Sequence, residues 1–273
     1  MATDDSPREH EDGEERPTDE FQTIPPTIVA AWRSVHGRDR NALRGGINND
    51  RAYVDELSGD LIVVADGLGV VGGPAAEIAV EVLSEGWQKS RPKNVPDAKI
   101  WLVGAFLEAH VRILKLERSH RIRRETTLTV GIRLGWTEVF AHVGDSRGYI
   151  WSSGKLALVT EDHTLAQRLA NQRLIDQEDV RQHWGRNQIE QVLGRRRAPP
   201  IVHLYDVPLK MGDIPLVCSD GVSDCIDLER EFAEAARLYP GDAASMCNYI
   251  INCVLAAGAR DDATLSLSVA LCN

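Results

Sequence analysis

The chain has 273 residues, a net charge of -10 and 43% hydrophobic residues, which is an ordinary globular composition. No run of residues approaches the roughly 18 apolar residues of a membrane span, and no secretory pattern opens the chain. The charge is unevenly spread, because residues 1–20 hold nine acids against two arginines. The nearly neutral remainder argues against sequence-independent nucleic-acid binding, which needs many cations. We therefore expect neither a nucleic-acid nor a membrane partner. We also expect a monomer.

The acidic N-terminal segment is poor in apolar residues, so residues 1–22 are predicted to form a disordered tail. Residues 23–273 are expected to fold as one domain. Five cysteines stand in the last quarter of the chain, an odd number without any Cys-x-x-Cys spacing. This pattern favours reduced thiols over a disulfide framework or a zinc site, and it predicts a cytoplasmic protein.

After the tail, short apolar runs predict strands and apolar residues at helical spacing predict helices. The expected strands are 27–32, 59–66, 126–134, 137–143, 147–151, 156–160, 200–207, 214–219 and 263–271. The expected helices begin at Pro74 and near Asp97, and cover about 164–193, 228–238 and 242–257. Four consecutive strands between 126 and 160 indicate an antiparallel meander. The order of elements predicts an α+β sandwich of two antiparallel sheets covered by helices.

Four aspartates follow or precede these strands beside glycine-containing turns: Asp66, Asp145, Asp220 and Asp261. A carboxylate at the end of a buried strand is costly unless it is paired or binds a metal. Carboxylate oxygens are hard ligands, which select Mg²⁺ or Mn²⁺ rather than zinc. One Asp-Gly pair is usually a plain turn. Four such acids in one domain favour a shared metal site.

Seven longer segments resemble the metal-dependent serine/threonine protein phosphatases of type 2C, in their compact bacterial form. In the family's order they are Asn48-Asn49-Asp50, Ala65-Asp66-Gly67-Leu68-Gly69, Thr126-Thr127-Leu128, His142 to Tyr149, Thr160 to Thr164, Cys218 to Asp224, and Arg260 to Thr264. The resemblance covers the chain except the tail. It implies a phosphatase catalytic domain whose central β-sandwich carries helices on both outer faces.

The resemblance also implies a site for two Mn²⁺ or Mg²⁺ ions, with a third, weaker ion beside them. The implied ligands of the two ions are Asp66 as the bridge, the Gly67 carbonyl, Asp220, Asp261, and Asp50 through metal-bound water. Asp145 and Asp224 match the residues that hold the third ion. Arg44, just upstream of Asn48-Asn49-Asp50, is the best candidate for the family's phosphate-binding arginine. A guanidinium fork suits a phosphate dianion.

The implied reaction is hydrolysis of phosphoserine and phosphothreonine in proteins by a metal-activated water, on clients of a serine/threonine kinase. Asn49 stands where the family usually has glutamate, so we expect weaker binding of the second ion. Ser146 and Ser219 are interpreted as local hydrogen-bonding residues at turns. Two alternatives remain: a catalytically weak relative that binds phosphoproteins or kinases as a regulatory module, and a two-metal phosphoesterase for a small molecule or nucleotide.

Overall fold

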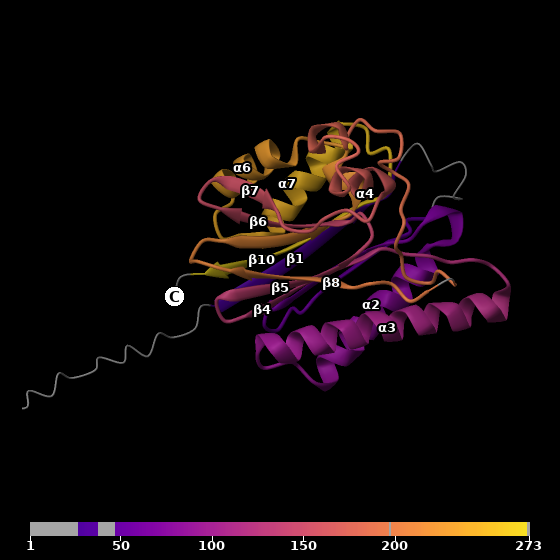
Figure 1. Ribbon diagram of the computed structural model, residues 1–273. Coiled ribbons are helices and arrows are strands. Elements are labelled where there is room, and N and C mark those ends of the chain that lie inside the picture. The colour runs from indigo at the N-terminus through magenta and orange to yellow at the C-terminus, as the bar shows by residue number, and fades with distance from the viewer. Residues whose placement is uncertain (1–26, 38–46, 197, 272–273) are drawn as a thin grey trace, which may run out of the picture.

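The computed structural model describes residues 27–37, 47–196 and 198–271, so the predicted tail over 1–22 and Arg44 lie outside the described residues. Two antiparallel sheets of five strands each pack face to face, and helices cover the outer face of each sheet (Figure 1). The predicted fold class, an α+β sandwich with helices on both outer faces, is confirmed.

The first sheet has the strand order β1 (Thr27–Val35), β10 (Ala263–Leu271), β9 (Ile214–Cys218), β6 (Arg147–Ser152) and β7 (Lys155–Leu158). Strand β10 lies inside this sheet and is buried on both faces. Leu265 and Leu267 pack into the cluster beneath the outer helices. Ser266, between them, faces the second sheet, where its hydroxyl donates to the Val63 carbonyl at 3.2 Å. The buried serine is therefore satisfied by a backbone acceptor.

The second sheet has the strand order β2 (Asp50–Val54), β3 (Leu61–Asp66), β4 (Leu128–Leu134), β5 (Thr137–Val143) and β8 (His203–Pro208). In β3, Leu61 and Val63 pack under the helices of this side, whereas Ile62 and Val64 face the first sheet. Because both faces of β3 are buried, its sequence is a continuous apolar run rather than an alternating one.

Helices α2 (Gly73–Lys89) and α3 (Val95–His120) cover the second sheet, and α6 (Leu228–Leu238) and α7 (Ala243–Ala256) cover the first (Figure 1). Short helices complete the described ranges: α4 (Leu165–Asn171), α5 (Asp220–Ser223) and the 3-10 turns η1 (Gly69–Val71) and η2 (Gln177–Asp179). Asparagine or aspartate side chains cap α3, α6 and α7 at their N-termini. None of the helices in the described ranges is long and apolar enough to cross a membrane.

The sequence-based prediction is wrong about one region and misses one strand. The region 164–193 was expected to be helical, but only α4 and the single turn η2 are helical there, and turns and extended stretches make up the rest. Its apolar residues are too scattered to form a helical stripe. Strand β2 was not predicted, because its five residues are short and mixed in polarity. It forms because it pairs with β3 along its whole length.

Candidate active site

Five aspartates meet at one end of the sandwich because each stands at or next to a strand end located there: Asp50, Asp66, Asp145, Asp220 and Asp261. Asp50 opens β2 and lies directly opposite Asp66, the last residue of β3. Residues opposite each other on antiparallel strands project their side chains to the same side. The structure therefore brings these sequence-predicted residues together.

The backbone of Asp66 is held by the Thr126-Thr127 pair that precedes β4. The Thr127 hydroxyl accepts from the Asp66 amide at 3.0 Å, and the Thr126 hydroxyl donates to the Asp66 carbonyl at 2.8 Å. These contacts fix the point at which β3 ends, so the carboxylate of Asp66 leaves a rigid strand rather than a loop. Rigid placement of this kind suits a residue of a binding or catalytic site.

The pKa values of these carboxyl groups are raised. Burial raises the pKa of Asp66 well above its usual value, and the neighbouring carboxylates add to the shift. The pKa of Asp50 rises to about 7, mainly through burial, against hydrogen bonds from Ser219 and Thr264 that lower it. Burial, followed by the charge of Asp220, also raises the pKa of Asp145. Bound cations would stabilise these buried, neighbouring carboxylates in their charged form.

The residues present fit a hard divalent cation. One carboxylate oxygen of Asp50 and one of Asp145 are buried and accept no hydrogen bond from any described residue. Within the described ranges, no three His, Cys, Asp or Glu side chains converge as a closed metal cage would. Mg²⁺ typically keeps several waters and takes only one or two carboxylates from the protein. The spread carboxylates are thus suited to hydrated ions.

Gly67 follows Asp66 at a point where a side chain would not fit. A Cβ atom there would lie 2.5 Å from the Gly72 carbonyl carbon and 2.7 Å from the Asn49 carbonyl oxygen. The loop from Gly67 to Gly72 therefore closes on itself, and Leu68 anchors it by donating its amide to the Glu125 carbonyl at 2.9 Å. Only glycine permits this close approach.

Asn49 holds the other end of that loop. Its side-chain oxygen accepts from the Gly73 amide at 3.0 Å, and its amide nitrogen donates to the Gly69 carbonyl at 3.2 Å. Both ends of the side chain are thus used by the loop. Asp50, not Asn49, projects beside Asp66.

Two residues that support the site were not predicted for this role. Ser219, interpreted above as a local turn residue, donates to Asp50 at 2.8 Å and accepts from the Thr264 amide at 2.9 Å. The Asp262 carboxylate accepts from the amides of Gly37 at 3.0 Å and Asn49 at 2.9 Å. The only sequence signal was their position next to Asp220 and Asp261.

A family model described as protein phosphatase 2C matches residues 39–255 of the chain. The chain belongs to the protein phosphatase 2C family. A serine/threonine phosphatase stp of Listeria monocytogenes is 30% identical over 215 residues, which cover 76% of this chain and 82% of the relative. The corresponding phosphatase of Listeria innocua is 31% identical over 217 residues, with the same coverage.

Solved structures of the family share the fold. The Mycobacterium tuberculosis phosphatase PstP/Ppp is 26% identical with a TM-score of 0.74, over 89% of this chain and 98% of that chain. The catalytic domain of PstP in complex with two manganese ions is 25% identical with a TM-score of 0.75, over 90% and 99%. The family and the enzyme class predicted from the sequence are confirmed: this type 2C protein is a metal-dependent protein serine/threonine phosphatase.

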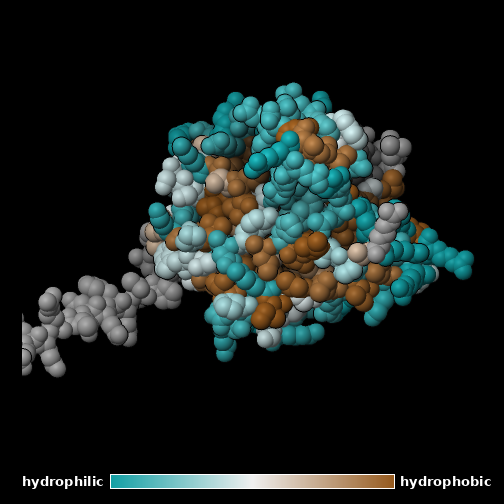
Figure 2. Space-filling view, viewed as in Figure 1, coloured by the Kyte–Doolittle hydropathy of each residue, from teal (hydrophilic) through white to brown (hydrophobic). Residues whose placement is uncertain are grey.

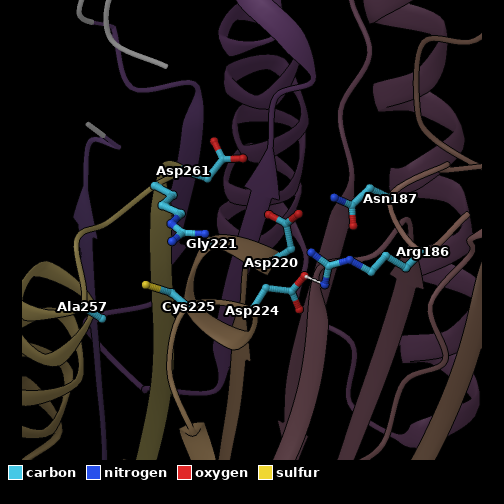
Figure 3. Close-up of a pocket in the computed structure, with 9 residues that line it drawn as sticks. Arg186, Asn187, Asp220, Gly221, Asp224, Cys225, Ala257 and Asp261 are labelled. Atoms are coloured by element: carbon cyan, nitrogen blue, oxygen red, sulfur yellow. Dashed lines mark hydrogen bonds and ion pairs between the residues drawn. The ribbon is translucent and has the colours of Figure 1, made fainter. Parts of the chain in front are cut away.

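A pocket of about 340 Å³ opens beside the aspartates of this phosphatase (Figure 3). Its walls are formed by Arg186, Asn187, Asp220, Gly221, Asp224, Cys225, Ala257, Arg260 and Asp261. Asp224 lies on this wall, but each of its carboxylate oxygens is already bound by an arginine, Arg147 at 3.1 Å and Arg186 at 3.2 Å. Asp145 and Asp224 are the two residues predicted to bind a third ion. Asp145 has a buried oxygen that no described residue satisfies, whereas both oxygens of Asp224 already bind arginines. The predicted phosphate-binding residue, Arg44, lies outside the described residues.

Proposed function

We propose that the aspartate cluster holds two Mn²⁺ or Mg²⁺ ions and that hydrolysis takes place there. The proposed ligands are Asp50, Asp66, the Gly67 carbonyl, Asp220 and Asp261. The observation that carries the proposal is the gathering of five carboxylates, two of them with buried oxygens that no described residue satisfies. Bound there, two divalent cations would activate a water molecule for in-line attack and offset the charge of the phosphate.

In this proposal Asp66 would contribute to holding both ions, because its carboxylate interacts with each of the other four acids. Asp220 and Asp261 would hold one ion, and the Gly67 carbonyl would contribute to the other. Asp50, which accepts a hydrogen bond from Ser219, would hold a water molecule of the second ion. Protein side chains thus position the reactants, and no serine or cysteine nucleophile is needed.

Arg44 is proposed to bind the phosphate of the substrate as a bidentate partner. The described part of the pocket adds the guanidinium of Arg260, an exposed cation beside Asp261. Anionic oxygens of a phosphopeptide would otherwise approach an acidic site. A cation at the pocket wall offsets that repulsion without entering the metal site.

The proposed substrates are phosphoserine and phosphothreonine proteins that a serine/threonine kinase has modified. This extends to our chain what the names of its relatives say of them. We further propose a cytoplasmic monomer whose residues 1–22 form a tail separate from the catalytic domain. The four cysteines in the described residues are free thiols, which suits a reducing compartment.

The test is hydrolysis of a phosphothreonine peptide with Mn²⁺, with Mg²⁺ and with EDTA. We expect activity only with added metal, and loss of activity in Asp66→Asn with an unchanged circular dichroism spectrum. Asp206→Asn is the matched control, because Asp206 lies on β8 and pairs with Lys99 at the surface. Full activity in EDTA or in Asp66→Asn would overturn the assignment. Tight phosphopeptide binding without turnover would instead favour the regulatory-module alternative.

A further inference from the structure

The segment between α4 and β8 is held over the pocket by backbone hydrogen bonds on both sides of Arg186. The Ala166 amide donates to the Gly185 carbonyl at 3.3 Å, and the Glu190 amide donates to the His163 carbonyl at 2.8 Å. Arg186 and Asn187 between these points line the pocket with Asp220 and Asp224 (Figure 3). The segment is therefore fixed to the body around a side chain that reaches the site.

The Asp224 carboxylate is shared by two arginines that come from different parts of the fold. Arg147, at the start of β6, donates to one oxygen and also binds Asp162 through both of its carboxylate oxygens, the closest contact being 2.6 Å. Only 12% of the Arg147 side chain is exposed, so this partner is built into the body. Arg186 binds the other oxygen and is 45% exposed. Of the two, only Arg186 can leave without disturbing the core.

We propose that Arg186 competes with a third divalent ion for the carboxylate of Asp224. The proposal rests on the function proposed above. When Arg186 binds Asp224, the segment around residue 186 is fastened across the pocket, and the outer oxygen of Asp224 is taken. An ion at that oxygen would stand within a few ångströms of the guanidinium, and the two cations would repel each other. The ion and Arg186 therefore compete for the same oxygen of Asp224.

Through this competition, binding of the third ion would control access to the pocket. Asp145 has a buried oxygen that no described residue satisfies, so one half of an ion site is open. The second half becomes available only when Arg186 swings away from Asp224. Release of Arg186 also loosens the wall that it forms with Asn187, and it leaves a free cation at the mouth of the pocket for the acidic part of a phosphopeptide. Access and ion binding are thereby coupled.

The first test needs no metal and no activity. Hydrogen exchange of the amides of Arg186, Gln188 and Glu190 is measured in EDTA for the full chain, for Arg186→Gln and for Asp224→Asn. We expect about two- to fivefold faster exchange in both variants, the effect of losing one partly exposed ion pair. Arg173→Gln, at an exposed arginine on the same segment, should exchange as the parent does. Unchanged exchange in both variants, with unchanged melting temperatures, would overturn the fastening.

The second test is calorimetric titration with Mn²⁺. The weak ion should bind about two- to fivefold more tightly in Arg186→Gln than in the parent or in Arg173→Gln, because its competitor is gone. The tight ions should be unaffected. In the parent, Mn²⁺ at concentrations that fill the weak site should accelerate exchange at Gln188 and Glu190. If Arg186→Gln leaves the affinity for the weak ion unchanged, the proposed competition is wrong. If the parent shows no tight Mn²⁺ binding at all, the result counts against the two-ion site itself.

Discussion

Ser219 donates a hydrogen bond to Asp50 across 169 residues of sequence, at 2.8 Å, in the buried floor of the site. The same hydroxyl oxygen accepts from the Thr264 amide at 2.9 Å, at the start of β10. One small side chain therefore joins the end of β9 to both sheets. The orientation of Asp50 depends on this joint.

We predict that Ser219→Ala raises the Mn²⁺ concentration at half-maximal activity by about tenfold, since residues that orient metal-site groups commonly have effects of this size. The free energy of unfolding should fall by about 1–3 kcal/mol, because the Thr264 amide loses its buried acceptor. Ser266→Ala removes another buried serine and is the control: it should lose stability without a change in metal requirement. Overlapping metal titrations for Ser219→Ala and the parent would refute the role.

The structure changes what we expect of Asn49. From residue type alone, an amide in place of a glutamate at position 49 predicts weaker binding of the second ion. The Asn49 side chain, however, forms hydrogen bonds with the backbone of Gly69 and Gly73. We predict that Asn49→Ala lowers the free energy of unfolding by about 1–3 kcal/mol, because the Gly73 amide is left without its acceptor.

The companion variants separate Asn49 from Asp50. Asn49→Glu should fail to lower the Mn²⁺ requirement, because the side chain at 49 is directed to the loop, whereas Asp50→Ala should raise that requirement sharply. Metal titrations of the two purified variants decide the point. A lower Mn²⁺ requirement in Asn49→Glu would show that residue 49 faces the ion after all.

Local patterns predicted much of this molecule. The apolar run that ends on Asp66 predicted both the buried strand β3 and the position of an acid at its end, where it can meet a ligand. The strands from Leu128 to Leu158 and the helices α6 and α7 were also predicted, because their periodicity is set by the faces they bury.

What the sequence could not show depends on distant partners. Asp262 is a structural acceptor because the amide of Asn49, 213 residues away, comes to it. The ion pair of Asp224 with Arg186 joins residues whose local sequences give no hint of each other. The segment around Arg186 is held by backbone contacts to α4 and the residues before it, not by its own periodicity. Such roles are properties of the packed chain.

The N-terminal residues offer a separate prediction. A chain that begins at Thr23 should keep the melting temperature and the activity on a small aryl phosphate of the full chain, because the acidic segment has almost no apolar residue to pack. A chain that begins at His36 is the control. It lacks β1, which pairs with β10 over nine residue pairs, so it should lose cooperative unfolding. Lower activity of the Thr23 form would show that the acidic segment contributes to the catalytic domain.

Three histidine rings contact one another in tilted and edge-to-face arrangements, and we predict that they make stability depend on pH. The ring centroids of His142 and His163 are 4.7 Å apart, and those of His163 and His203 are 4.4 Å apart. Burial lowers the pKa of His142 well below its usual value and lowers that of His163 to about 4. Both rings are therefore neutral in the folded chain at pH values where an unfolded chain binds protons.

The sign of the effect follows from these directions. A depressed pKa in the folded state gives stability that is complete above about pH 6.5 and is lost as the pH falls towards 4. For His163 the loss at pH 5 is about 2 kcal/mol, from 1.4 kcal/mol per pH unit below 6.5. The raised pKa of Asp50 acts in the opposite direction in the metal-free chain, so a single pH profile would mix the two effects.

The comparison of variants isolates the histidine. Urea unfolding of the parent and of His163→Gln at pH 7.5 and pH 5 gives the difference in free energy at each pH. His163→Gln should be less stable than the parent at pH 7.5, because the Gly144 amide loses its acceptor at His163 Nδ1. That deficit should shrink by about 2 kcal/mol at pH 5, since glutamine takes up no proton in either state. His120→Gln, at an exposed ring at the end of α3, is the control and should show no such change in stability between the two pH values. If the deficit of His163→Gln is equal at both pH values, His163 is charged in the folded chain at pH 5 and the prediction is wrong.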